Sequence, residues 1–261
     1  MVLLMIICNI KDPHMDEFFI LVLCLTILFA SIVHGAIGFG FGMISTPVIA
    51  LFTDMQTTIL YMLIPTMVTN IISISSEGKF FEALKKFWFI ITLMVIGSAL
   101  GTVLLLYTNS EFFKLLLAAI IFLYLLQSFV KIEATFVSKY PKASTYGLGV
   151  FGGMLSGLTN IVAPLMIMYT LELKYSRKDT VQLSNLCFLF TKIGQISVFL
   201  YYGSFTMEDF NISMICVAVI FIGMFLGIKL KKIIDAKLYV KILKVLLFII
   251  ATTLVVQTVS F

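Results

Sequence analysis

The chain has 261 residues, of which 61% are hydrophobic and only 12% are charged. A soluble domain carries about 25% charged residues, whereas several apolar runs here reach the ~20 residues that a bilayer-spanning helix needs. Composition therefore indicates an all-α integral membrane protein. It excludes a soluble domain, and it excludes a membrane β-barrel because no ~10-residue segments alternate between apolar and polar residues.

The ionisable residues and the cysteines exclude further classes. The net charge of +5 is spread over short loops, so it bears on membrane orientation and indicates no nucleic-acid partner. The four cysteines form no CxxC pair and there are only two histidines, so we expect no metal site and no cofactor. The expected partners are a small anionic substrate and membrane lipid, and the oligomeric state stays open.

The order of apolar runs divides the chain into two similar halves. Residues 1–17 form an N-terminal extension without the basic start of a secretory signal, and translation from Met1 or Met15 stays open. Residues 18–130 form a first membrane repeat, 131–144 a polar linker and 145–261 a second repeat. The predicted apolar segments are Phe18–Val33, Gly38–Phe52, Thr57–Ser76, Phe87–Tyr107, Phe112–Val130, Tyr146–Tyr169, Val181–Tyr202, Phe210–Lys229 and Leu238–Val259.

Three landmarks recur in the same order in both halves. The segment "HGAIGFGFGMISTPVIALF" (His34–Phe52) aligns with "FGGMLSGLTNIVAPLMIMY" (Phe151–Tyr169). The segment "TNIISIS" then aligns with "TKIGQIS", which places Asn70 opposite Lys192. Finally "GSALG" aligns with "GMFLG". The shared order indicates an internal duplication.

The first glycine-rich segment predicts a helical hairpin. Phe18–Phe52 would be about 52 Å long as one helix, too long for a single crossing of a ~30 Å core. Glycines cost a helix roughly 1 kcal/mol each relative to alanine. We therefore expect two short helices that enter and return on the same side; the alternative is one kinked, steeply tilted helix. The glycines concerned are Gly35, Gly38, Gly40 and Gly42.

The distribution of cations favours the hairpin. With one hairpin and three full spans per half, 15 cations fall on one side, and only Lys11 and Lys114 fall on the other. If each glycine segment crosses once, the tally becomes 10 against 7. By the positive-inside rule the hairpin arrangement is preferred. It predicts two inverted repeats, each a glycine-hinged hairpin plus three transmembrane helices, with the 131–144 linker cytoplasmic and both termini external.

These segments resemble the TauE/SafE family of sulfite and organosulfonate exporters. The resemblance rests on "GAIGFGFGMISTP" (Gly35–Pro47), on "GGMLSGLTNIVAP" (Gly152–Pro164) and on the later GxxxG pairs Gly97/Gly101 and Gly223/Gly227. It covers most of the chain from Phe18 onward. The resemblance implies a secondary transporter in the cell membrane, an exporter of small sulfur-containing anions such as sulfite or sulfoacetate. For the GxxxG pairs themselves we favour close helix packing.

Lys192 is the strongest candidate site residue. It lies near the middle of Val181–Tyr202, where an ammonium costs roughly 2.5–3.5 kcal/mol on insertion scales and cannot snorkel to either surface. An anion-binding or proton-coupling role would explain it; the alternative is a buried lysine kept neutral, or paired with a helix-end carbonyl, for structural reasons. Gln195 lies one turn away, and Asn70, with Thr66 and Ser73 one turn to either side, forms a corresponding polar stripe in the first half.

The glycine turns supply the remaining predicted site. A short helix that starts inside the membrane presents unpaired N–H groups and a positive dipole end, which bind anions. Glycine lets a substrate approach this backbone closely; close helix packing is the alternative reading. The predicted substrate-binding residues here are Gly38, Gly40, Gly42, Gly157, Thr159 and Asn160.

His34 and Ser156 complete the candidates. His34 adjoins the first glycine and is a candidate for proton coupling, although a hydrogen-bonded structural histidine is the simpler reading. Ser156 lies between glycines, loosely as in an intramembrane serine protease, but the second half contains no histidine to activate it. An intramembrane enzyme therefore remains an alternative to transport, as does a permease for another small anionic metabolite.

Overall fold

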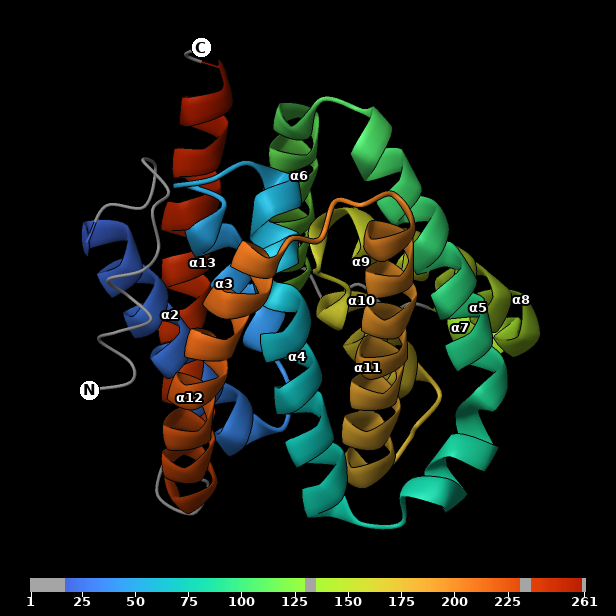
Figure 1. The fold of residues 1–261 in the computed structure, drawn as a ribbon. Helices are drawn as coiled ribbons and strands as arrows, with labels where there is room; N and C mark the ends of the chain where they lie inside the picture. Colours follow the sequence, from blue (N-terminus) through green and yellow to red (C-terminus); the bar gives the residue numbers. More distant parts are fainter. Residues whose placement is uncertain (1–16, 130–134, 231–235, 260–261) are drawn as a thin grey trace.

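The computed structural model describes residues 17–129, 135–230 and 236–259, and the regular structure within these ranges is helical. The predicted all-helical class is therefore confirmed. Figure 1 shows the arrangement of the helices. In chain order they are α2 (Glu17–Ile37), α3 (Phe41–Ile49), α4 (Met55–Glu77), α5 (Phe80–Tyr107), α6 (Ser110–Phe129), α7 (Thr135–Lys139), α8 (Pro141–Gly147), the π-helical turn η1 (Leu148–Gly152), α9 (Gly153–Thr159), α10 (Ala163–Glu172), α11 (Arg177–Tyr201), α12 (Met207–Leu230) and α13 (Ala236–Val259).

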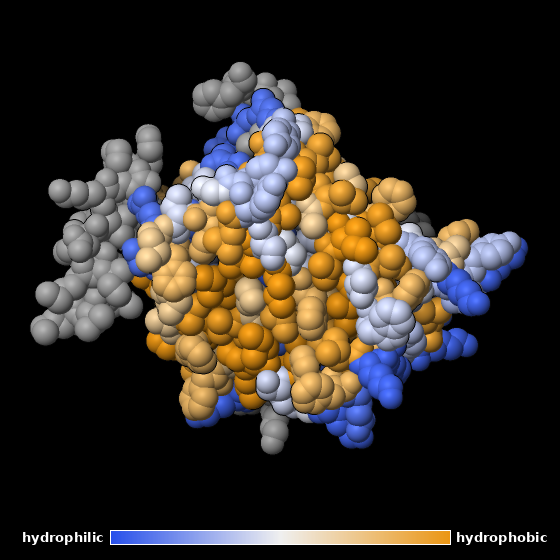
Figure 2. Space-filling model, turned by 45° about the vertical axis from the view of Figure 1, so that its right-hand side comes forward, coloured by the Kyte–Doolittle hydropathy of each residue, from blue (hydrophilic) through white to orange (hydrophobic). Residues whose placement is uncertain are grey.

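Several of these helices have the length and composition of membrane spans. Within the described residues five qualify, namely Phe18–Ile37, α4, α5, α11 and α12. Figure 2 shows a broad apolar surface across the middle of one face, with hydrophilic residues gathered toward its edges. Lipid chains are the environment that such a surface requires. The protein is a multi-pass membrane protein.

The first glycine segment forms the predicted hairpin. Gly38 and Gly40 separate α2 from α3 and have φ values of 100° and 108°, which glycine adopts without steric cost. The chain then returns to its starting side, because the Phe18 and Phe52 rings lie 6.2 Å apart. The single tilted helix is therefore wrong. The prediction of two short helices is also wrong for α2, whose 21 residues span about 31 Å.

The second glycine segment is also a hairpin, but its turn is not made by glycine. A continuous helical run, α8–η1–α9, ends at Asn160, whose φ is 59°. The chain returns through α10, and the Thr145 and Tyr169 hydroxyls meet at 2.7 Å. Asparagine adopts this left-handed conformation more readily than other non-glycine residues. The predicted glycine hinge is therefore wrong for the second hairpin, since the nearest glycine, Gly157, lies inside α9.

Helical structure also extends into the predicted linker. The helix α7 lies within residues 131–144, and α8 begins at Pro141 rather than after Ser144. Proline suits the first helical position because its missing N–H has no intrahelical partner there. Residues 130–134 lie outside the described part of the chain.

The GxxxG pairs pack each half against the hairpin of the other half. A Cβ atom on Gly97 or Gly101 would collide with the backbone of Val150 or Met154 in the second hairpin. A Cβ on Gly227 would collide with the backbone of Ile32 in α2. The absence of side chains lets the helices approach closely, and the packing role predicted for these glycines is confirmed.

The helices α4 and α11 pack against each other at the centre of the molecule (Figure 1). Each also packs against one long helix of the other half, α4 against α12 and α11 against α5. The remaining pair, α6 and α13, pack together. The pairs α2–α12 and α5–α9 complete the interface between the halves.

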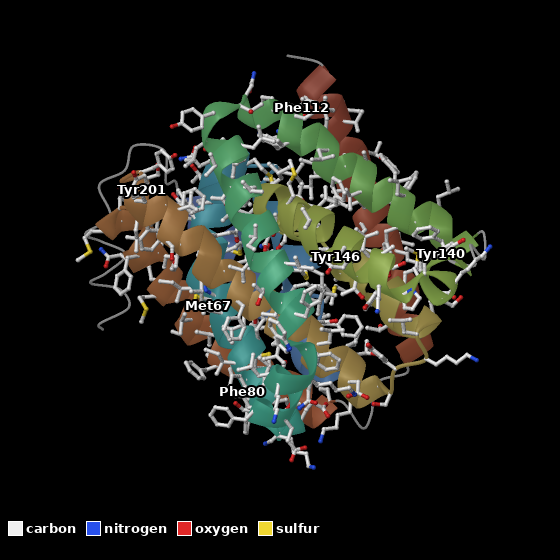
Figure 3. All side chains as sticks on the ribbon, turned by 90° about the vertical axis from the view of Figure 1, so that its right-hand side faces the viewer. Met67, Phe80, Phe112, Tyr140, Tyr146 and Tyr201 are labelled. Atoms are coloured by element: carbon white, nitrogen blue, oxygen red, sulfur yellow. The ribbon has the colours of Figure 1, made fainter. Side chains whose placement is uncertain are left out.

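The molecule has two distinct ends. At the terminal end, Gln257 of α13 donates a 3.1 Å hydrogen bond to the Leu51 carbonyl, next to the Phe18–Phe52 contact. At the cationic end, Lys86 forms a 2.7 Å ion pair with Asp179. Phe80, at the start of α5, lies at the opposite end of the molecule from Phe112 (Figure 3).

Candidate functional site

A small central cavity lies where the two hairpin turns meet α4 and α11. Its volume is about 20 Å³, which is room for about one water molecule. No single segment supplies its wall, since both halves of the chain contribute. It is lined by His34, Gly40, Phe41, Gly42, Met43, Thr66, Asn70, Ser156, Asn160, Ile161, Ala163, Phe188 and Lys192.

Lys192 is fully buried at this cavity, with 0% of its surface exposed. Its Nζ donates a hydrogen bond to Oε1 of Gln195. Gln195 in turn donates from Nε2 to the Gly157 carbonyl at 3.1 Å. This second bond orients the amide so that its oxygen faces the ammonium. None of the cavity-lining residues is an aspartate or glutamate, so the lysine charge lacks an anionic partner there.

Asn70 and Thr66 supply unpaired polar atoms to the same cavity. Both side chains are buried, and the Asn70 amide nitrogen, the Asn70 amide oxygen and the Thr66 hydroxyl have no hydrogen-bond partner. A buried polar group without a partner costs about 1–3 kcal/mol. These atoms lie on α4 at neighbouring turns, so a polar ligand would satisfy both residues at once.

His34 connects α2 to the start of α3 and to α4. The Phe41 N–H, at the first position of α3, donates to Nδ1 of His34 at 3.3 Å. Nδ1 therefore carries no proton, and the proton on Nε2 is donated to the Ser73 hydroxyl at 2.8 Å. An Nδ1 that accepts a hydrogen bond indicates a neutral imidazole, and the two bonds join the hairpin turn to α4.

The two hairpin turns touch each other beside the cavity. Asn160 donates from Nδ2 to the Thr46 hydroxyl at 2.8 Å, and its carbonyl would lie 3.0 Å from a Cβ placed on Gly42. The two turns are therefore in direct contact. The first turn of α3 faces the cavity through Gly40–Met43, and the N–H groups of a first turn lack partners within their helix. Pro164 removes one such group from α10.

The predicted site residues fall into two layers. The cavity wall contains Lys192, Asn70, His34, Gly40, Gly42 and Asn160. The other five lie behind it and bond to neighbouring groups instead. Gln195 accepts a hydrogen bond from Lys192, and Ser73 is hydrogen-bonded to His34. The Gly38 carbonyl accepts a 2.7 Å bond from Asn185, and the Gly157 carbonyl accepts one from Gln195. The Thr159 hydroxyl donates to the Leu155 carbonyl at 2.8 Å.

Sequence reasoning did not place several wall residues in the site. Thr66 was detectable, since it lies one helical turn before Asn70. The others carry no polar pattern that distinguishes them from packing residues, and Ser156 was considered only as a nucleophile. The wall residues absent from the predicted site are Phe41, Met43, Thr66, Ser156, Ile161, Ala163 and Phe188.

A larger cavity opens at the terminal end, between the starts of α4 and α12. Its volume is about 650 Å³, and its wall includes Phe52, Asp54, Leu60, Tyr61 and Ser204. We call it the vestibule. Tyr61 lies about one and a half helical turns from Thr66 of the central cavity, so the vestibule ends close to the candidate site.

Comparison with known proteins gives one finding. The sequence matches the family described as "Sulfite exporter TauE/SafE" over residues 23–254, nearly the whole chain. No curated protein and no solved structure matches significantly. The matched range contains both hairpin turns and the two helices that carry Asn70 and Lys192.

Proposed function

The chain belongs to the TauE/SafE family of sulfite exporters, and on that premise we propose that it moves a small sulfur-containing anion across the cell membrane through the central cavity. The family match places the chain in a family of membrane transporters. The proposal adds the binding site, with Lys192 as the main counter-charge and Asn70, Thr66 and the first turn of α3 as hydrogen-bonding groups.

The observation that carries the proposal is the isolated charge of Lys192. A buried ammonium costs several kcal/mol unless an anion or a full set of hydrogen bonds compensates it. Gln195 supplies one neutral acceptor, and no carboxylate lines the cavity. A bound anion would compensate this charge, and it would also satisfy the unpaired atoms of Asn70 and Thr66.

The size of the cavity implies that the structure is a closed state of the transporter. A volume of about 20 Å³ holds about one water molecule, whereas a sulfur oxyanion has at least four heavy atoms. The hairpin turns and α4 or α11 must therefore separate to admit it. The vestibule at the terminal end supports passage of the anion between the central cavity and that side.

Two inverted repeats would provide this movement, as in many secondary transporters. In this arrangement α2–α6 correspond to the segments from α8 to α13. The matching contact pairs support it, since α5 packs on α9 as α12 packs on α2. The hairpins also open at opposite ends: Phe18 meets Phe52 at the terminal end, and Tyr169 lies 6.4 Å from Tyr175, whose ring is beside Lys86 at the cationic end.

The same cations support a membrane orientation. At the cationic end, Lys79 and Lys174 lie in connecting segments, Lys86 lies in the first two turns of α5, and Arg177 is the first residue of α11. The positive-inside rule places this end in the cytoplasm and the terminal end outside.

A transport assay on Lys192→Met tests the function. Methionine keeps most of the side-chain volume and removes a desolvation cost, so the fold should survive. Efflux of sulfite from proteoliposomes should fall at least tenfold, while exposed Lys85→Met should transport at the wild-type rate. A well-folded Lys192→Met protein with full anion flux would show that the lysine is structural and that the proposed site is wrong.

The alternatives differ in what they require of the cavity. A permease for another small anion uses the same site, and a binding screen of sulfite, sulfonates and carboxylates separates the two. An intramembrane enzyme would need Ser156 activated by a base. The Ser156 hydroxyl instead donates to Thr191 at 3.5 Å, and His34 is bonded to Ser73 and Phe41.

A further inference from the structure

The central cavity has a defined formal charge. Of the residues in its wall, Lys192 is the only cation of the lysine–arginine type, and none is acidic. His34, the remaining titratable wall residue, is neutral because Nδ1 accepts the Phe41 N–H and Nε2 gives its proton to Ser73. Gln195, Ser73 and Asn185, which pack behind the wall, carry no charge. With Lys192 protonated, as the proposed function requires, the site carries one positive charge.

The unpaired groups also define what the cavity can bind. The Lys192 ammonium has three N–H donors, of which one is used by Gln195. The Asn70 amide contributes two donors and one acceptor, and the Thr66 hydroxyl contributes one more donor. The set favours a ligand with several acceptor oxygens and allows one hydroxyl donor, which the Asn70 oxygen would accept.

We infer that the cavity selects singly charged oxyanions, such as a sulfonate or a protonated sulfur oxyanion, and rejects divalent anions of the same shape. This inference rests on the proposed function and adds the charge of the substrate to it. One anionic charge neutralises Lys192. A second would be buried without a partner, which costs free energy in a site that excludes water.

Binding of two fixed-charge anions tests the inference. Methanesulfonate and sulfate are both tetrahedral at sulfur and have similar sizes, but they carry one and two negative charges at neutral pH. Titration calorimetry on the purified full-length protein, at matched ionic strength, should give a methanesulfonate affinity at least tenfold higher than that of sulfate. Equal or tighter binding of sulfate by the wild-type protein would overturn the inference.

A substitution at Asn70 tests the same inference by adding a positive charge to the site. Asn70→Lys adds a second cation to the wall, at the position that aligns with Lys192, and should shift the preference toward sulfate at least tenfold. Asn70→Leu, which adds no charge, should weaken both anions without reversing their order. Unchanged selectivity in a folded Asn70→Lys protein would contradict the charge argument; if this variant does not fold, the wild-type comparison still decides.

The two levels of the proposal fail in different ways. Binding of both anions with equal affinity, abolished by Lys192→Met, would remove the charge selectivity and leave the proposed site intact. Binding of neither anion, together with full sulfite efflux by Lys192→Met, would overturn the proposed site and the inference with it.

Discussion

Asn160 in the second hairpin donates a 2.8 Å hydrogen bond to the hydroxyl of Thr46 in the first. The two residues are 114 positions apart in the chain, and both are buried. This bond joins the two turns directly beside the central cavity. It is therefore a structural link between the halves at the point where the proposed function requires them to separate.

We expect loss of this link to destabilise the protein. Thr46→Val leaves the Asn160 amide without its partner and should lower the free energy of unfolding by about 1–3 kcal/mol. Asn160→Ala should cost more, because alanine is also disfavoured at a φ of 59° by roughly 1–2 kcal/mol. Asn160→Gly, which tolerates the backbone, is the control for the second effect. Unfolding in detergent measures all three, and strictly additive costs in Thr46→Val/Asn160→Ala would argue against the bond.

The packing of Gly97 predicts a contrast between two glycine substitutions. A Cβ on Gly97 would overlap the Val150 backbone, whereas a Cβ on Gly147 meets nothing within 4 Å. Gly97→Ala should therefore destabilise the protein by about 1–3 kcal/mol. Gly147→Ala should be neutral or stabilise it by up to about 1 kcal/mol, because alanine is the better helix former. Thermal unfolding of both variants checks this; equal melting temperatures would contradict the packing role.

The sequence predicted the first hairpin but misplaced the second turn for a physical reason. Glycine serves two purposes here, positive φ at Gly38 and Gly40 and close helix contact at Gly153 and Gly157. Composition cannot separate these purposes. The actual second turn uses Asn160, a residue whose occasional left-handed conformation leaves no pattern in a single sequence.

The candidate site was predictable where chemistry alone identifies a residue. Lys192 and Asn70 are polar residues in apolar helices, and both lie in the cavity wall. Gln195 and Ser73 are also polar residues in apolar helices, but they lie outside the cavity wall and form hydrogen bonds with Lys192 and His34. Which polar groups face the cavity depends on how the helices are rotated about their axes, and the spacing of polar residues leaves that rotation open.

The orientation of the protein predicts which introduced cysteines react in intact cells. Thr108 follows α5 at the terminal end and is exposed, and Lys142 in α8 is exposed toward the cationic end, whereas neighbouring Ser144 is buried and unsuitable. Thr108→Cys should react with an impermeant maleimide from outside. Lys142→Cys should react only after permeabilisation. Labelling of Lys142→Cys in intact cells would refute the proposed orientation.

The two ends of the molecule differ in how tightly they are closed. At the cationic end, Lys86 pairs with Asp179 at 2.7 Å and lies over the Phe87 and Tyr175 rings at 5.0 and 5.6 Å. Gln182 of α11 also donates to the Gly78 carbonyl there. At the terminal end, by contrast, the vestibule separates the starts of α4 and α12. If the protein alternates between opening at one end and at the other, these contacts hold the cationic end closed in the state described by the structure.

Removing the Lys86 contacts should therefore shift the protein toward the opposite state. Lys86 and Asp179 are partly exposed, at 50% and 28%, so their ion pair contributes about 0.2–1 kcal/mol, which corresponds to a population change of up to about fivefold. A cysteine at Ser204, a half-buried residue of the vestibule wall, should then react more slowly with a hydrophilic thiol reagent in Lys86→Met than in the parent. The control is Lys79→Met, which removes a 2.9 Å ion pair with Glu82 at the same end. That pair lies within the start of α5 and does not connect two helices. Slower labelling in both variants would indicate a general charge effect, and unchanged labelling in Lys86→Met would show that this contact does not hold the cationic end closed.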